Sequence, residues 1–320
     1  MQTYFLRRLL LIPFTLFLIS IIFFGMLRAI PGDTADALFA DPGNAISEAG
    51  LLKLREDLGL TRPIHVQYAD WMWHILRGDL GYSFHFSEPV TDLLKARLPR
   101  TAELMTIGIV GSLMIGIPLG VISAYKPDSL LDNIVRFIAI SGLTLPSFVV
   151  ACLILIVLAK VFNWTPLAAG ISFPELWDDP IANLKIMIFP SLVLIIHGAA
   201  PYMRLTRSQM LEVIRQDYIR TARAKGLSER VILLRHALRN SLLPILTLAA
   251  VQISRLIAGA VVVEVVFEVR GIGNAIVQGA LNRDYALLQS LVLLIALAVL
   301  AINLLTDLVY SWVDPRIKYA

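Results

Sequence analysis

Charged residues are scarce in this sequence. They make up 16% of the 320 residues, whereas hydrophobic residues make up 57%. A typical soluble domain carries about 25% charged residues. With so few charges and a mean hydropathy of +0.74, the chain is too apolar for an ordinary water-soluble domain, and its composition predicts an integral membrane protein.

Cysteine is almost missing, and histidine is thinly spread. The one cysteine, Cys152, lies inside a hydrophobic run, which excludes an intramolecular disulfide and a cysteine-based metal cluster. The five histidines are scattered along the chain, and no H-E-x-x-H motif occurs. We therefore predict no metal site.

Motifs for catalysis are absent as well. There is no G-x-x-x-x-G-K-[ST], so the chain does not bind ATP through a P-loop, and there is no G-x-S-x-G. A membrane-embedded hydrolase would have to pair Ser112 or Ser141 with His197, and nothing in their spacing supports that arrangement. We expect a chain that is not an enzyme and binds no cofactor itself.

Long hydrophobic runs are what the sequence does have. Six stretches can cross about 30 Å of hydrocarbon as helices. They lie near Leu9–Leu27, Ala102–Ala124, Ile134–Val161, Ile186–Met203, Leu242–Val266 and Leu287–Trp312. The first lacks an A-x-A cleavage pattern and is longer than a signal-peptide core, so it reads as an uncleaved span. We predict an all-α integral membrane protein with six transmembrane helices. Its three parts are an N-terminal segment with the first span (1–30), a helical loop (31–100) and a core (101–320).

Loop charge predicts the orientation. The segment 204–240 holds nine Lys or Arg residues and three Asp or Glu residues, whereas the segment 163–185 holds three acidic residues and one lysine. By the positive-inside rule, the basic segment is cytoplasmic. With six spans, both termini are then cytoplasmic and the loop 31–100 lies outside.

The basic segment 204–240 has the pattern of two short helices that meet at a glycine. Asp217 is a suitable N-cap, Tyr218–Lys225 contains good helix formers, and Gly226 occupies the position of a left-handed C-terminal cap. Ser228 can cap a second helix. In that helix Val231, Leu234 and Leu238 share one face, so we expect it to lie at the headgroup surface before the chain turns at Pro244.

The stretch TARAKGLSERVILLRHALRNSLLP resembles the EAA loop of ABC-importer permeases of the dipeptide, oligopeptide and nickel branch, B-type subunit. Ala222 and Gly226 match that family's pattern, whereas Arg220 replaces its Glu and Thr221 replaces an Ala. The resemblance implies a coupling helix that docks on an ATPase subunit. The implied coupling residues are Asp217, Tyr218, Arg220, Thr221, Ala222, Arg223, Lys225 and Gly226. The alternatives are a basic loop that touches only anionic lipid, and a nucleic-acid site, which two tethering spans disfavour.

Five further stretches are similar to the same branch: RAIPGDTAD, the run from LREDLGL to LGYSF, PVTDLLKARLPRT, GAVVVEVVF and DPRIKY. The resemblance implies the type I permease fold in a prokaryotic inner membrane, in contact with membrane lipid. The implied partners are a second homologous permease, two ATPases that carry ATP and Mg, and a solute-binding protein. The loop 31–100 either shields the span tips or also receives that binding protein.

Ionisable residues and a proline inside the spans are candidates for a translocation path. Arg255 lies about 13 residues into the fifth span, roughly 20 Å deep at 1.5 Å per residue. Pro146 lies inside the third span, where we expect it to kink the helix, and Asp307 lies in the sixth span. For Arg255, the alternatives to a path residue are a buried ion pair or a contact with the partner permease.

Glycines in the second span predict close helix packing. Gly108, Gly111, Gly116 and Gly120 include a G-x-x-x-G motif, which allows two backbones to approach each other in a membrane. The motif does not identify the partner helix.

We therefore expect an ABC-importer permease that takes up di- or oligopeptides. A nickel or other small-solute permease of the same family is the nearest alternative. A different class, an ion-gradient transporter with Arg255, Glu264 and Asp307 as relay groups, would often show inverted repeats, and none is evident.

Overall fold

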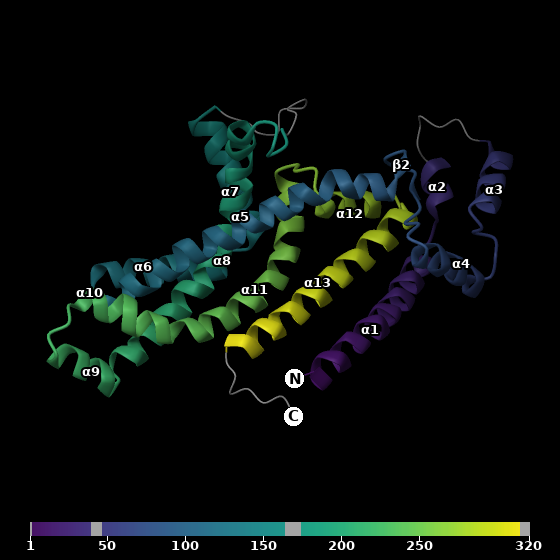
Figure 1. The fold of residues 1–320 in the computed structure, drawn as a ribbon. Coiled ribbons are helices and arrows are strands. Elements are labelled where there is room, and N and C mark those ends of the chain that lie inside the picture. The colour runs from purple at the N-terminus through teal and green to yellow at the C-terminus, as the bar shows by residue number, and fades with distance from the viewer. Residues whose placement is uncertain (1, 40–46, 164–173, 314–320) are drawn as a thin grey trace. The chain divides into compact units, whose positions relative to one another are not determined.

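The computed structural model describes residues 2–39, 47–163 and 174–313, with the backbone alone for residues 2–7, 37–39, 48, 250 and 307–313. The described chain is almost entirely helical, with one two-stranded hairpin (Figure 1). The expectation of an all-α protein is confirmed. Two compact units are present: Met1–Pro99 with Arg270–Leu304, and Arg100–Val269 with Leu305–Ile317.

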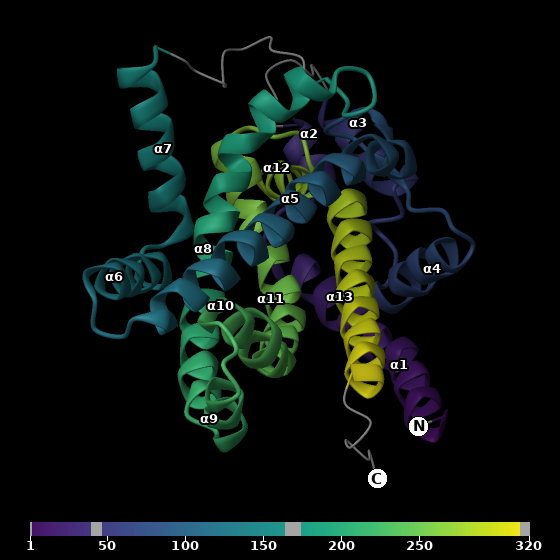
Figure 2. The same cartoon turned by 60° about the vertical axis from the view of Figure 1, so that its left-hand side comes forward.

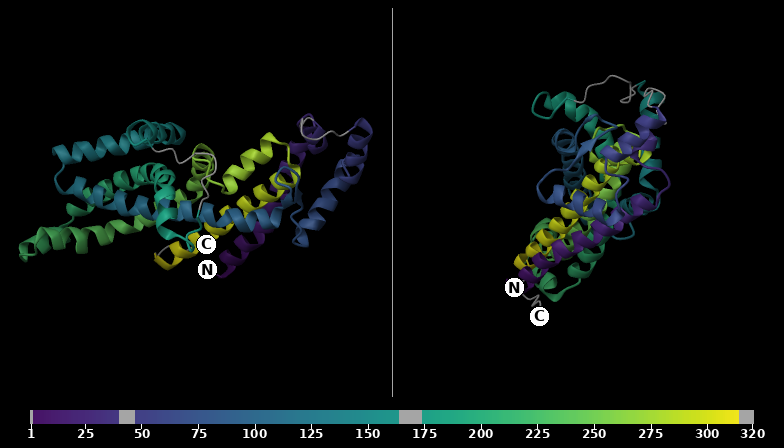
Figure 3. Two further views of the ribbon diagram at one scale, coloured as in Figure 1. Left: turned by 90° about the horizontal axis from the view of Figure 1, so that it is seen from above. Right: turned by 90° about the vertical axis from the view of Figure 1, so that its right-hand side faces the viewer.

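The first unit consists of the two ends of the chain and the segment that follows the first helix. Its elements are α1 (Gln2–Ala29), α2 (Thr34–Phe39), α3 (Glu48–Asp57), α4 (Ile64–Leu76), β1 (Tyr82–Ser83), β2 (Glu88–Pro89), the first residues of α5 (Val90–Tyr125), α12 (Ile272–Leu281) and most of α13 (Tyr285–Val313). Helices α1 and α13 lie side by side in both views of Figure 3. Leu27 of α1 packs with Tyr285 and Leu288 of α13, which buries apolar surface between them.

The segment between α1 and α5 is organised by turns that glycines permit. The sequence predicts helices ending at Gly59 and Gly78, and the structure has α3 and α4 followed by these glycines at φ +66° and +82°. A left-handed residue after a helix favours glycine, because a Cβ would clash with the backbone. A third predicted helix at Pro89–Leu98 is not separate, because it forms the start of the 36-residue α5.

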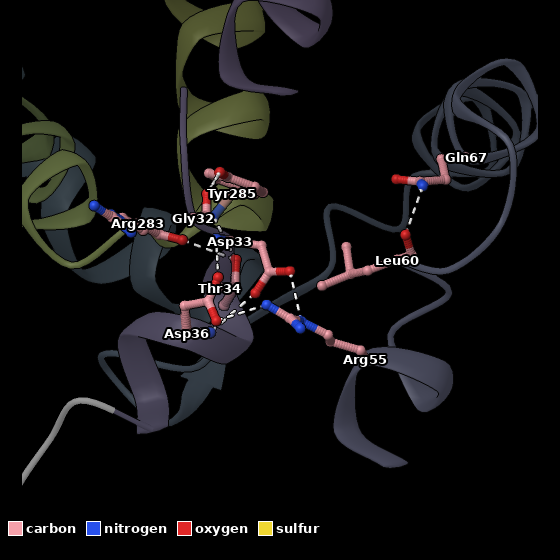
Figure 4. A network of polar contacts seen from close by, with 9 residues as sticks. All are labelled: Gly32, Asp33, Thr34, Asp36, Arg55, Leu60, Gln67, Arg283 and Tyr285. Atoms are coloured by element: carbon pink, nitrogen blue, oxygen red, sulfur yellow. Dashed lines mark hydrogen bonds and ion pairs between the residues drawn. The ribbon is translucent and has the colours of Figure 1, made fainter. Parts of the chain in front are cut away.

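Ion pairs connect α3 to the residues that follow α1. Arg55 of α3 donates to Asp33 at 2.9 Å and to Asp36 at 2.6 Å, and Asp36 also accepts from the Asp33 backbone N–H (Figure 4). The last bond and Arg55 together hold the pKa of Asp36 below its ordinary value. The Thr34 hydroxyl donates to the Arg283 carbonyl, which joins this segment to the residues before α13.

The second unit contains the remaining helices. They are the rest of α5, α6 (Leu130–Thr144), α7 (Ser147–Val161), α8 (Pro180–Ile214), α9 (Asp217–Ala224), α10 (Glu229–Val231), the π-helical η1 (Ile232–Ala237) and α11 (Leu238–Val266). A buried apolar core from α5, α7, α8 and α11 includes Leu104, Ala151, Leu194 and Leu256.

The glycines of α5 pack against α8. A Cβ on Gly116 would lie 2.8 Å from the backbone oxygen of Ala199, and a Cβ on Gly120 would lie 2.8 Å from that of Met203. Gly108 and Gly111 face Leu194 and Ile195 at similarly short range. The predicted close packing is confirmed, and α8 is the partner helix.

The third predicted span is broken rather than kinked. Helices α6 and α7 meet at Leu145 and Pro146 with a bend of 109°. Proline disfavours helical geometry in the residue before it, and Leu145 is extended with ψ 128°. Five described helices are long and apolar enough to cross a membrane, and the number reaches six if α6 and α7 form one span.

Candidate functional site

Helix α9 is a short amphipathic helix at one end of α8 (Figure 2). The basic segment begins later than predicted, because α8 continues to Ile214 and takes in the first predicted loop residues. Gly226 follows α9 with φ +77°, so the predicted left-handed residue is confirmed. Asp217 is not the N-cap, since Gln216 holds that position without a side-chain bond and Asp217 is the first helical residue.

The inner face of α9 packs against other helices of the second unit. Ile219 and Ala222 are buried in a cluster with Val121 of α5, Met210 of α8 and Ile232 of η1. The Tyr218 hydroxyl accepts a hydrogen bond of 2.7 Å from Asn240 of α11. Helix α9 therefore packs with α5, α8 and η1 and is hydrogen-bonded to α11.

The outer face of α9 is polar and mostly basic. Asp217, Tyr218, Arg220, Thr221, Arg223, Lys225 and Gly226 are all exposed. Arg223 binds Glu229 through two hydrogen bonds of 2.8 and 3.3 Å, which raises the pKa of Arg223. Of the eight residues predicted for coupling, only Ala222 is buried, and the other seven are accessible.

The second predicted helix differs from its expectation. The residues after Ser228 do not form a separate surface helix that turns at Pro244, because α10, η1 and α11 are continuous and Pro244 lies inside α11. The Ser228 side chain makes no capping bond. The buried residues are Ile232, Leu233 and Ala237, whereas the predicted apolar positions Val231 and Leu234 are exposed. A π-helical turn changes the angular step per residue, which a face assigned from α-helical spacing cannot anticipate.

A buried ion pair near α9 was not found by sequence reasoning. Asp132 of α6 is fully buried and accepts two hydrogen bonds of 2.7 Å from Arg207 of α8. It also accepts from the Asp128 backbone and from the Ser123 hydroxyl of α5. An acid in the first turn of an apolar helix is a weak signal, because exposed acids are common there. The contacts connect three helices at their shared end.

A pocket with a mainly apolar lining lies where α6, α7, α8 and α11 meet. Its volume is about 190 Å³. The polar side chains that line it are Ser147 of α7, His197 of α8, and Gln252 and Arg255 of α11. The remaining lining is apolar or glycine: Gly142, Leu143, Leu194, Gly198, Pro201, Leu256 and Gly259. The pocket therefore gathers residues from four helices around one cation.

The polar groups in this pocket are incompletely paired. Arg255 is exposed and forms no ion pair with any residue that the structure describes. Gln252 is 5% exposed, and its Oε1 has no partner in the described chain; the buried Nδ1 of His197 likewise has none. Buried polar groups are normally hydrogen-bonded, so these atoms are suited to a polar ligand that passes through.

The other two path candidates are less informative. Pro146 sits at the sharp bend beside Ser147, next to the pocket. Asp307 lies outside the residues whose side chains are described. Among the described residues, no group of His, Cys, Asp or Glu could hold a metal ion.

Comparisons with known proteins place these features in a family. The family model described as "Binding-protein-dependent transport system inner membrane component" matches residues 116–319, and the model of its N-terminal part matches residues 1–105. A putative peptide transport system permease of Brucella abortus is 37% identical over 94% of both chains. The oligopeptide transport system permease of Bacillus subtilis is 38% identical over the full length of both. The dipeptide transport system permease of Alkalihalophilus pseudofirmus is 36% identical over the same extent.

A solved structure has the same fold. A chain of the MetNI methionine ABC transporter, in an inward-facing conformation, superposes with a TM-score of 0.54 at 15% identity, covering 69% of this chain and 96% of that one. The resemblance seen in the EAA-like loop and in five other stretches is thereby confirmed, and the chain is a non-catalytic, multi-pass inner-membrane subunit. It belongs to the family of binding-protein-dependent ABC transport system permeases, with the type I importer fold.

Proposed function

We propose that this chain is a permease subunit of an ATP-driven importer that takes up di- or oligopeptides. Three relatives of nearly full length carry names of peptide, oligopeptide or dipeptide permeases. The cargo is delivered by a solute-binding protein on the outer side. A second homologous permease completes the pathway, and two ATPases with ATP and Mg drive it from the cytoplasm, where both termini of this chain lie.

The observation that carries the proposal is the division of α9 into two faces. Ile219 and Ala222 are buried against α5, α8 and η1 of the same unit. Arg220, Thr221 and Lys225 are exposed. An amphipathic helix with one face buried in its own protein and the other exposed is suited to bind in a groove of a partner. The outer face of α9 is therefore the docking surface for an ATPase subunit.

Movement of α9 is transmitted to the pocket lined by Arg255. Helix α9 follows α8 after Arg215 and Gln216, and it leads through α10 and η1 into α11. Helices α8 and α11 supply His197, Gln252 and Arg255 to that pocket. A displacement of α9 during ATP binding therefore changes the width of the pocket, as alternating access requires.

Arg255 then attracts the carboxylate of a peptide in transit. A guanidinium pairs with a carboxylate through two parallel hydrogen bonds, and no described carboxylate occupies Arg255. The pocket volume of about 190 Å³ suits one terminal group better than a whole peptide. A passing cargo is thus held at one end and stays mobile.

Mild detergent extraction from native membranes, with a tag on this chain, tests the assembly. We expect mass spectrometry to find two P-loop ATPases, a sister permease and a binding protein, whose bound ligand identifies the cargo. Reconstituted vesicles should accumulate a dipeptide only when ATP is supplied on the α9 side. A chain that purifies alone and drives uptake with an ion gradient would contradict the proposal and favour a secondary transporter.

A further inference from the structure

A second and larger cavity lies in the first unit. Its volume is about 450 Å³, within the range of small-molecule sites. The walls come from α1, α13, the whole inner side of α4, and the turns on either side of α4. The aromatic part of the lining is made by Phe24, Trp71, Tyr82, Phe84 and Tyr285.

Three residues that line this cavity each carry a buried hydrogen-bond donor without a partner in the described chain. In the part of the chain that the structure describes, Nε of Arg28, Nε1 of Trp71 and Nε2 of Gln289 have no acceptor. Gln289 is 4% exposed, so solvent does not readily serve it. Leaving such donors unpaired is unfavourable, which indicates that an acceptor-rich group fits among them.

The three donors are held near one another by two aromatic rings. The Arg28 guanidinium carbon lies 5.2 Å from the centre of the Phe24 ring and 4.9 Å from that of Tyr285. Trp71 stacks on Phe24 with ring centres 5.6 Å apart. Gln289 follows Tyr285 by one helical turn of α13, so both occupy the same face. The three residues are therefore linked to one another through the Phe24 and Tyr285 rings.

The other part of the cavity offers acceptors. The Gln67 amide nitrogen donates to the carbonyls of Leu60 at 3.0 Å and Arg62 at 2.7 Å, and Figure 4 shows its oxygen directed away from Leu60. Because both neighbours are carbonyl oxygens, the amide cannot be reversed, and Oε1 remains unpartnered among the described residues. The carboxylates of Asp57 and Asp79 also line the cavity.

We propose that this outer cavity binds a zwitterionic peptide, with its carboxylate at Arg28, Trp71 and Gln289 and its ammonium group near Gln67 and Asp57. Donors in one region and acceptors in another match the two ends of a short peptide, and the aromatic walls suit its side chains. This inference rests on the proposed uptake of peptides. It adds a site in the segment that follows α1, distinct from the smaller pocket at Arg255.

Equilibrium binding to the assembled importer in phosphatidylcholine nanodiscs, without the binding protein, tests the site. The probe is radiolabelled alanyl-phenylalanine, compared with its C-terminal amide and its N-acetyl form. We expect the amide to bind on the order of tenfold more weakly than the free acid, because it loses charge-assisted hydrogen bonds. Acetylation should weaken binding as well, by a smaller factor.

Variants assign the effect to the cavity. Gln289→Leu and Trp71→Phe each remove one donor while keeping size or aromatic character, and each should weaken binding of the free acid several-fold without affecting the preference against N-acetylation. Arg77→Gln is the matched control, because Arg77 lies over the Trp73 ring and does not line the cavity; it should bind like the unchanged protein. Melting curves of each variant separate lost binding from lost folding, and Trp71→Phe provides the test if Gln289→Leu does not assemble.

Two results would overturn the inference. One is equal binding of the free acid and the amide. The other is displacement of the peptide by added phosphatidylglycerol that is itself weakened by Gln289→Leu and Trp71→Phe, which would assign the donors to a lipid phosphate. ATP-driven uptake of the same dipeptide, measured with the binding protein present, tests the importer function independently of the outer site. If uptake proceeds while the binding results fail, the outer site is wrong and the importer function stands.

Discussion

Helix α8 has two faces that are built in opposite ways. Toward α5 it meets glycines so closely that a Cβ on Gly116 would lie 2.8 Å from the Ala199 oxygen. Toward α11 it borders the pocket that contains His197 and Arg255. On that side, a Cβ added to Gly259 would make an ordinary van der Waals contact with Leu194 at 3.4 Å.

The difference separates a fixed contact from a movable one. Backbones that touch through glycines lose many van der Waals contacts if they separate by even 1 Å, so α5 and α8 move as one body. Toward α11, by contrast, α8 packs through side chains such as Leu194 against Leu256, and packed side chains can slide past one another when two helices shift. We infer that ATP-driven motion passes between α8 and α11 and leaves the contact between α5 and α8 unchanged.

The largest effect is expected from filling the α5–α8 contact. Gly116→Ala puts a methyl group against backbone atoms and should destabilise the protein by about 1–3 kcal/mol, seen as a lower melting temperature and less folded protein in detergent. The matched control is Gly259→Ala on the other face, which meets ordinary van der Waals distances and should change the melting temperature little. Equal destabilisation by both variants would remove the distinction between the two faces.

Gly226 is required for its backbone conformation and not for close packing. It has φ +77° and nothing within 4 Å of an added Cβ, so only backbone strain matters there. Gly226→Val should strain the turn by about 1–2 kcal/mol and uncouple ATP hydrolysis from uptake while the chain still inserts. Gly226→Asn should retain uptake, since Asn accepts left-handed geometry, whereas Gly116→Asn should fail to fold. Normal uptake by Gly226→Val would contradict a coupling role for α9.

Substitutions of Arg255 test whether this residue binds the cargo in the pocket. Arg255→Ala should reduce uptake of a dipeptide about tenfold, as expected for loss of a charged hydrogen bond, and should leave assembly with the partner subunits intact. Arg255→Lys keeps the charge but not the bidentate geometry, so its dipeptide uptake should lie between that of Arg255→Ala and that of the unchanged protein. Loss of assembly in Arg255→Ala, measured by co-purification, would instead assign Arg255 to a structural contact.

The smallest effect is expected in the first unit. The pKa of Asp36 is lowered by the Asp33 N–H and by Arg55, so its stabilising contribution is present above the unfolded-state pKa and is lost as pH falls through the folded pKa. An exposed ion pair of this kind contributes about 0.5 kcal/mol. Asp36→Asn should therefore lower the melting temperature slightly at pH 7 and by less at pH 3. An equal decrease at both values would show that charge is not the cause.

The sequence predicted the α5–α8 contact much better than the pocket. Four glycines on one helix are a local pattern, and they identified the tight face of α5, though not α8 as its partner. Gly226 and the helix before it were likewise predictable, because caps and turns depend on a few adjacent residues. The residues that line the pocket come from four helices and are brought together only by tertiary packing.

The errors have similar causes. Pro146 predicted a kink, but the size of the bend depends on what α7 packs against. The face assigned to Val231 and Leu234 failed because the π-helical turn shifted the spacing. Asp132 escaped notice because its partner Arg207 is on another helix and was counted with the basic loop. In each case the local signal was real, and a distant contact determined the outcome.

Site-directed labelling tests the central claim most directly. In a Cys152→Ser background, single cysteines at Ser147, which lines the pocket, and at Ser112, which is buried against α8, are exposed to a maleimide in the assembled importer. With and without ATP and vanadate, we predict a change of several-fold in the labelling rate at position 147 and negligible labelling at position 112 in both states. Unchanged labelling at 147, or nucleotide-dependent labelling at 112, would contradict the division of α8 into a movable and a fixed face.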